Sequence, residues 1–233
     1  MPHTDAKTIM LIETLAKMET SRAVLSFINA VLADAGREPV NSITSQRHII
    51  RDDAEDCRLD VKGKIDGQPA MFQIRQSNGP DSVHHAFADG FAVLHQEIMA
   101  AQTYQDVPTI TIINLFDGPS PRPAHPYYHQ PIQLTYMDDP KETASNRLTV
   151  HILETGKFDE TNFDVGNALA RWMYYLKTGW RLPRAPLTRE VLSMDAGLRL
   201  FADAQNPGQR SRRTHAAQPP AKRKPSHDQS RGR

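Results

Sequence analysis

The chain has 233 residues, of which 39% are hydrophobic, and this is enough for one domain with a sizeable core. It contains no apolar run of about 18 residues, and its start, Met1 to Leu15, carries acids where a secretion signal has basic residues. We therefore expect a protein of the cytoplasm that neither spans a membrane nor is exported. The single cysteine, Cys57, excludes an internal disulfide and any metal site built from several cysteines.

The net charge of +1 hides an uneven distribution along the chain. Residues 207–233 hold eight basic residues and one acid, so the rest of the chain has 20 basic and 26 acidic residues and a charge of −6. Because this tail has almost nothing to bury, we expect it to be disordered. Its basic side chains are candidates for binding nucleic-acid phosphates, and a purely solubilising tail is the alternative. The candidates are Arg210, Arg212, Arg213, Lys222, Arg223 and Lys224.

In chain order, apolar residues that recur every three or four positions first predict one or two helices over residues 9–33. A break is expected around Thr20 and Ser21, and Gly36 suits the end of the helix. A strand is expected over 39–51. It is followed by a hairpin over 59–76, whose Asp66-Gly67 pair suits a type I′ turn because both residues tolerate positive φ.

The second half of the chain predicts further strands and helices. Residues Val83, Phe87, Phe91, Leu94 and Ile98 are spaced as the apolar stripe of a helix that packs on a sheet. The remaining expectations are a buried strand over 107–116, a proline-rich loop over 117–131, strands over 132–137 and 147–153, a helix over 166–179, and one last helix over 188–205. This order predicts a mixed sheet covered by helices, an α/β or α+β core spanning residues 1–206, with residues 207–233 as the tail.

The hairpin places polar side chains on one face. Asp60, Lys62 and Lys64 alternate with apolar residues in the first strand, and Gln73 and Arg75 do so in the second. Residues two apart in a strand project to the same face, so these side chains share one surface. A merely solvated hairpin face is the simplest interpretation.

Five segments in order carry a resemblance to a known family. They are "LSFINAVL", "LDVKGKIDGQ", "SNGPDSVHHAF", "LTVHILETGKF" and "LSMDAGLRLFADA". Together they resemble successive landmarks of the PD-(D/E)XK nuclease family transposases, the recombination-promoting nucleases, over about residues 9–205.

The resemblance implies a restriction-endonuclease-like fold and a bacterial or mobile-element protein that cleaves DNA and so promotes recombination. In that family the first hairpin strand presents an Asp, here Asp60. The second strand presents Glu-x-Gln or Glu-x-Lys, and a divalent ion, Mg²⁺ or Mn²⁺, lies between them. Phosphodiester hydrolysis needs such hard oxygen ligands and a polar or cationic group to orient the attacking water.

The second strand departs from the family pattern. The resemblance places Gln73 at the position of the metal-binding Glu and Arg75 at the Gln or Lys position; a shift by one places Ile74 and Gln76 there instead. Neither alignment supplies a carboxylate, and Arg75 adds a positive charge that repels a metal ion. The first helix also departs, with Ile12, Glu13, Leu15 and Ala16 where the family has a Phe-Lys-x-Leu-Phe pattern.

Two functions are therefore open: an endonuclease that is impaired or inactive, and a non-catalytic DNA-binding or protein-interaction module on the same fold. Glu19, Glu55 or Asp56 are the candidates for a replacement carboxylate.

Several other residues invite a functional interpretation. His84 and His85 are expected to be ordinary surface or partly packed residues, and Trp172, Met173, Tyr174, Tyr175 and Trp180 to pack in the core. "HPYYHQ", residues 125–130, is expected to pack as a loop, with base stacking or metal binding as alternatives.

Overall fold

The computed structural model describes residues 6–17, 21–50, 57–77, 81–116 and 120–205. Its helices are α1 (Ala6–Lys17), α2 (Arg22–Asp34), α3 (Ser82–Ala100), α4 (Ala168–Tyr174), α5 (Pro186–Met194) and α6 (Ala196–Gln205). Its strands are β1 (Ser42–Ile50), β2 (Cys57–Ile65), β3 (Gln68–Ser77), β4 (Thr109–Phe116), β5 (His129–Thr135) and β6 (Thr143–Glu154). Short turns of helix occur at Tyr104–Asp106, Thr155–Lys157 and Tyr175–Gly179.

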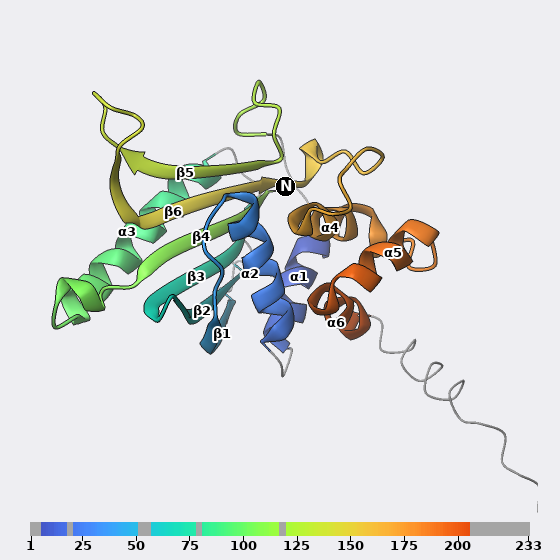
Figure 1. Ribbon diagram of the computed structural model, residues 1–233, viewed down its shortest axis with the longest axis horizontal. Helices are drawn as coiled ribbons and strands as arrows, with labels where there is room; N and C mark the ends of the chain where they lie inside the picture. Colours follow the sequence, from blue (N-terminus) through green and yellow to red (C-terminus); the bar gives the residue numbers. More distant parts are fainter. Residues whose placement is uncertain (1–5, 18–20, 51–56, 78–80, 117–119, 206–233) are drawn as a thin grey trace, which may run out of the picture.

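The six strands form one mixed sheet in the order β1-β2-β3-β4-β6-β5 (Figure 1). Strands β1, β2 and β3 are antiparallel neighbours, β3, β4 and β6 are parallel, and β5 returns antiparallel to β6. The predicted hairpin is confirmed: Asp66 and Gly67 have φ values of 48° and 78°, the left-handed backbone that a type I′ turn requires.

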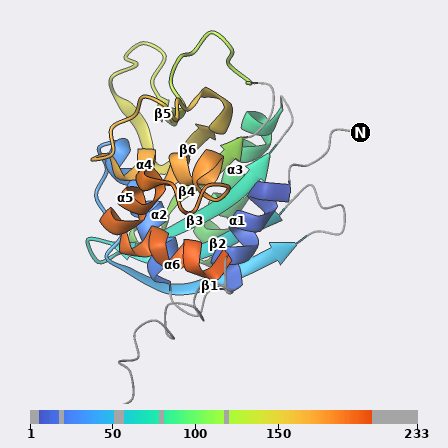
Figure 2. The same cartoon turned by 90° about the vertical axis from the view of Figure 1, so that its right-hand side faces the viewer.

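Helices cover both faces of this sheet. Helices α1, α2, α4, α5 and α6 lie on one face, here called the α2 face, and α3 lies on the other, the α3 face (Figures 1 and 2). Four buried apolar residues of the hairpin, Leu59, Val61, Phe72 and Ile74, belong to the core on the α2 face, whereas Met71 belongs to the core on the α3 face. A mixed sheet flanked by helices is the α/β architecture expected from the pattern, and it is consistent with the restriction-endonuclease-like fold.

Helix α3 exists as predicted, and Val83, Phe87 and Leu94 of the predicted stripe pack against the core on the α3 face, whereas its other two residues do not. Phe91 and Ile98 are 46% and 44% exposed, whereas Ala86 and Gly90 are buried against the sheet. A Cβ on Gly90 would lie 2.7 Å from Leu148 Cδ1 in β6. Where the helix comes closest to the sheet it therefore carries its smallest side chains, because close packing of the helix backbone at Gly90 leaves no room for a ring there.

The predicted last helix is wrong in one respect, because it is two helices divided at Asp195. This residue is extended, with φ −133° and ψ 107°, and its carboxylate accepts hydrogen bonds from Leu198 N at 2.9 Å and Ser26 Oγ at 2.8 Å. Aspartate is a favoured residue before the first turn of a helix, and here it both starts α6 and ties that helix to α2.

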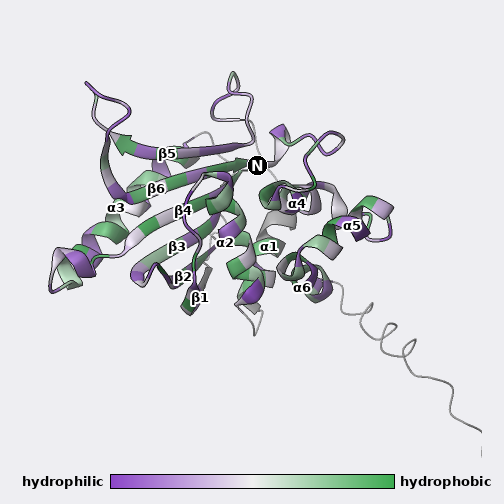
Figure 3. Ribbon diagram, in the orientation of Figure 1, coloured by the Kyte–Doolittle hydropathy of each residue, from purple (hydrophilic) through white to green (hydrophobic). Residues whose placement is uncertain are grey.

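The predicted loop over 117–131 is too long, since β5 already begins at His129. Pro131 pairs with His151 although proline cannot donate a backbone hydrogen bond. The sheet tolerates it because β5 is an edge strand. The loop between β5 and β6 is largely hydrophilic, as Figure 3 shows.

The one or two helices predicted over residues 9–33 are two, α1 and α2, and Gly36 follows α2 with φ +66°. The expected core residues are confirmed as well: Trp172, Met173, Tyr174 and Tyr175 are buried, and Trp180 is partly buried. No helix in the described part of the chain is long and apolar enough to cross a membrane.

Candidate functional site

The pairing of β2 with β3 decides which second-strand residues share a face with Asp60. Asp60 lies directly opposite Gln73, and Arg58 lies directly opposite Arg75. Directly opposed residues of an antiparallel pair project to the same side, so these four side chains belong to the α3 face. Ile74 is in the core on the other face. The pairing therefore places Gln73 and Arg75, and not Ile74, on the face that carries Asp60.

Asp60 lies among cationic side chains. Arg58 Nε is 3.4 Å from Asp60 Oδ1, and the Asp60 side chain is 14% exposed. Arg47 of β1 is the cross-strand partner of Asp60, and Lys62 follows two residues later on the same strand and face. Neither Arg47 nor Arg58 was singled out from the sequence, because the partner strand of β2 cannot be aligned residue by residue without its fold.

Gln73 is fully buried on this face. Neither its Oε1 nor its Nε2 has a hydrogen-bond partner within the described ranges. A buried amide without a partner costs on the order of 1 to 3 kcal/mol. Gln73 therefore keeps its place opposite Asp60 at a cost to the stability of the fold.

Arg75 is held by α3. Its guanidinium donates to the Asp89 carboxylate, and its side chain is only 7% exposed. Two turns further along α3, Glu97 Oε1 lies 3.2 Å from Lys62 Nζ. The polar face of the hairpin thus docks α3 through two ion pairs. The spacing of eight residues between Asp89 and Glu97, which places both on one side of a helix, was the signal in the sequence for this contact.

The residues of this face do not fit the divalent metal ion that the resemblance implies. Such an ion prefers several carboxylate and carbonyl oxygens. Asp60 is the one carboxylate that the described part of the hairpin strands presents here, and Asp89 is engaged by Arg75. Within the described residues there is no group of three or more His, Cys, Asp or Glu side chains that could hold a metal ion.

Other predicted positions are either exposed or outside the described residues. His84 and His85 are both exposed, as surface residues should be. The candidate replacement carboxylates Glu19, Glu55 and Asp56 lie outside the described residues. The same is true of the six basic tail residues, Arg210, Arg212, Arg213, Lys222, Arg223 and Lys224.

The "HPYYHQ" segment lies partly in a loop and partly in a buried series of hydrogen-bonded polar side chains. Tyr127 is 67% exposed, whereas His129 is buried in β5 rather than packed in a loop. Its Nδ1 lies 2.6 Å from Asp34 Oδ2, and its Nε2 lies 2.9 Å from His151 Nδ1. Asn167, the N-cap of α4, donates to the other Asp34 oxygen at 2.7 Å. This series of hydrogen bonds joins the end of α2 to β5, β6 and α4.

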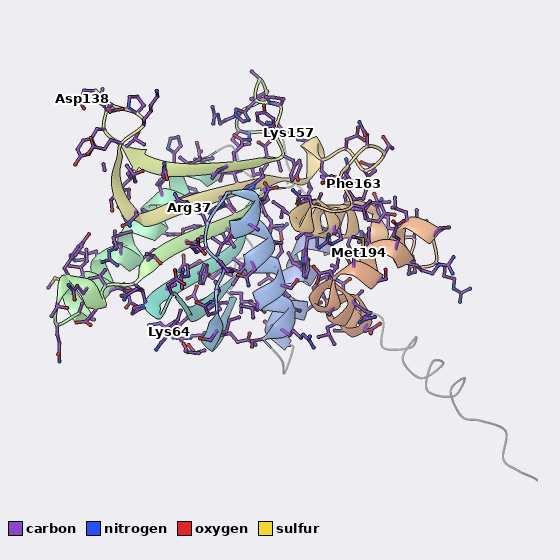
Figure 4. The ribbon with its side chains drawn as sticks, in the orientation of Figure 1. Arg37, Lys64, Asp138, Lys157, Phe163 and Met194 are labelled. Carbon is purple, nitrogen blue, oxygen red and sulfur yellow. The ribbon has the colours of Figure 1, made fainter. Side chains whose placement is uncertain are left out.

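Charge and burial determine the protonation states of Asp34 and His151 in this series. The hydrogen bond from His129 lowers the pKa of Asp34, so that carboxyl is ionised. Burial lowers the pKa of His151 from 6.5 to about 3, with the charges of His129 and Arg37 acting in the same direction. Arg37 lies near the end of α2 (Figure 4) and donates to the Gln133 side chain. His151 is therefore a neutral imidazole, and its Nε2 has no hydrogen-bond partner among the described residues.

Comparison with known proteins assigns the family. No curated protein and no solved structure gives a significant match. A family model, PD-(D/E)XK nuclease family transposase, matches residues 14–229, which is most of the chain and includes the whole hairpin. The chain therefore belongs to the PD-(D/E)XK nuclease family transposases.

Proposed function

We propose that this protein binds DNA as a member of its family but has an impaired or inactive nuclease site. The observation that carries the proposal is the second-strand position opposite Asp60, which holds the buried neutral amide of Gln73. An amide oxygen lacks the full negative charge that a carboxylate brings to a metal ion. Asp60 keeps the first half of the motif, while Gln73 and Arg75 occupy its second half.

Arg75 supports the same conclusion. In an active site the group at this position orients the attacking water or contacts the scissile phosphate. Here its guanidinium is turned to Asp89 on α3 and is almost fully buried. A side chain held in this way serves the docking of α3 rather than the positioning of a reactant.

The basic tail supplies the argument for DNA binding. Eight basic residues and one acid in residues 207–233 form a positive segment on a body of charge −6. Clustered Lys and Arg neutralise phosphates and release counterions, which gives salt-sensitive affinity without sequence preference. The endonuclease remains the second candidate, with Glu55 or Asp56, directly before β2, supplying the missing acid.

Cleavage of supercoiled plasmid tests the proposal. The full-length protein is incubated with Mg²⁺ or Mn²⁺ beside Asp60→Ala and Gln73→Glu, each purified identically. We expect no nicking above the Asp60→Ala background by the unaltered protein. Gain of nicking by Gln73→Glu would show that one ligand was lost. Metal-dependent nicking by the unaltered protein that Asp60→Ala abolishes would overturn the proposal and establish the endonuclease.

DNA binding is measured separately, by fluorescence anisotropy of a labelled duplex as a function of salt. We expect affinity that falls steeply with salt and that a chain ending at Gln205 loses, because the tail charges are then absent. Equal affinity with and without the tail would refute its role.

A further inference from the structure

The face that carries Asp60 has more positive than negative charge. Its cations are Arg47, Arg58, Lys62, Lys64 and Arg75, and the acids that face them are Asp60, Asp89 and Glu97. The net charge of this cluster is therefore +2. A divalent cation would raise it to +4, whereas the single negative charge of a phosphodiester would lower it to +1. Like charges on adjacent positions of a sheet destabilise each other, so the cluster favours an anion.

We propose that this face takes a phosphate oxyanion directly, at the position where active relatives hold a metal ion. Three cations surround Asp60: Arg58 and Lys62 lie two residues away on its own strand, and Arg47 lies across from it on β1. In a sheet such neighbours are about 5 to 8 Å apart, a spacing that lets two or three long side chains reach one phosphate group. The inference rests on the proposed loss of metal-dependent cleavage.

The accessibility of the cations supports a ligand from solution. Lys62 is 56% exposed at its side chain although it pairs with Glu97, and Arg47 is exposed, while Arg58 and Asp60 are partly exposed. Gln73 and Arg75, on the same face, are buried. The donors that a phosphate needs, guanidinium and ammonium groups, are therefore on the outside of the cluster, and the single hairpin carboxylate lies between them.

The chemistry of the donors distinguishes the two kinds of ligand. Guanidinium and ammonium groups have only hydrogen-bond donors and cannot coordinate a cation. The Gln73 amide is fully buried, so the donors that a ligand from solution can reach are those of the exposed cations. Two ligands offer such a phosphate oxyanion: the backbone of DNA and free inorganic phosphate.

The test uses the full chain in EDTA and a charge-matched pair of double variants. Arg47→Gln/Lys62→Gln removes two exposed cations from the cluster, and Arg189→Gln/Arg199→Gln removes two exposed cations from α5 and α6. Circular dichroism checks that both fold. Binding of a labelled DNA duplex is followed by anisotropy, and binding of inorganic phosphate by ³¹P line width.

We expect the hairpin variant to bind DNA about tenfold more weakly and to lower the slope of log K against log salt by about 1 to 2, with the control variant unchanged. Hairpin-dependent phosphate broadening without DNA binding would support a free-phosphate site and would refute only the proposed DNA function. DNA binding that is equal in both variants would overturn the inference and leave that function intact. Mn²⁺ binding detected by electron paramagnetic resonance and abolished by Asp60→Asn would also overturn it.

Discussion

Acidification should destabilise this fold through His151. In the unfolded chain this imidazole takes up a proton below pH 6.5, whereas burial lowers its pKa in the folded protein to about 3. Between these values the unfolded state binds more protons, so the free energy of unfolding rises with pH and is lost as the pH falls. Because one pKa unit corresponds to about 1.4 kcal/mol, lowering the pH from 7 to 5 should cost about 2 kcal/mol through His151 alone.

Urea denaturation at pH 7 and pH 5 measures this cost in the unaltered protein and in His151→Asn. The asparagine amide does not titrate and can still bond His129 Nε2, so the variant should lose about 2 kcal/mol less between the two pH values. His95→Asn, which removes an exposed histidine of α3, should leave the pH dependence as it is. The reasoning fails if His151→Asn shows the same loss as the unaltered protein.

Two further substitutions test how the helices pack. Gly197→Ala should destabilise the protein by about 2 to 3 kcal/mol in urea denaturation, because the new Cβ would overlap Ser26 Cβ and come within 3.1 Å of Arg22 O; a loss below about 0.5 kcal/mol would contradict this packing. Asn167→Ala should cost about 1 to 2 kcal/mol, since it removes the hydrogen bonds to Ala170 N and Asp34, whereas Asn167→Ser should recover the cap. Equal stability of the two Asn167 variants would show that the cap contributes nothing.

The sequence predicted the hairpin residues of the candidate site but not their partners from other elements. The alternation of polar and apolar residues fixed which side chains of each strand go together, and Asp60 and Gln73 are neighbours as expected. The partners from outside the hairpin, Arg47 from β1 and Asp89 from α3, were not predicted. Sequence distance hides such pairs, because contacts between strands and helices depend on register and on the side of the helix that faces the sheet.

The order and type of most elements followed from the sequence alone, since hydrophobic period and turn residues act locally. Asp66-Gly67 formed the predicted turn because its backbone preference needs no tertiary partner. Tertiary structure alone decided which residues of the predicted α3 stripe stay exposed, the division of the last helix at Asp195, and the burial of His129 and His151 in one hydrogen-bonded series with Asp34. These outcomes depend on close approach between distant segments, where available volume and the hydrogen-bond partners of buried polar groups outweigh local pattern.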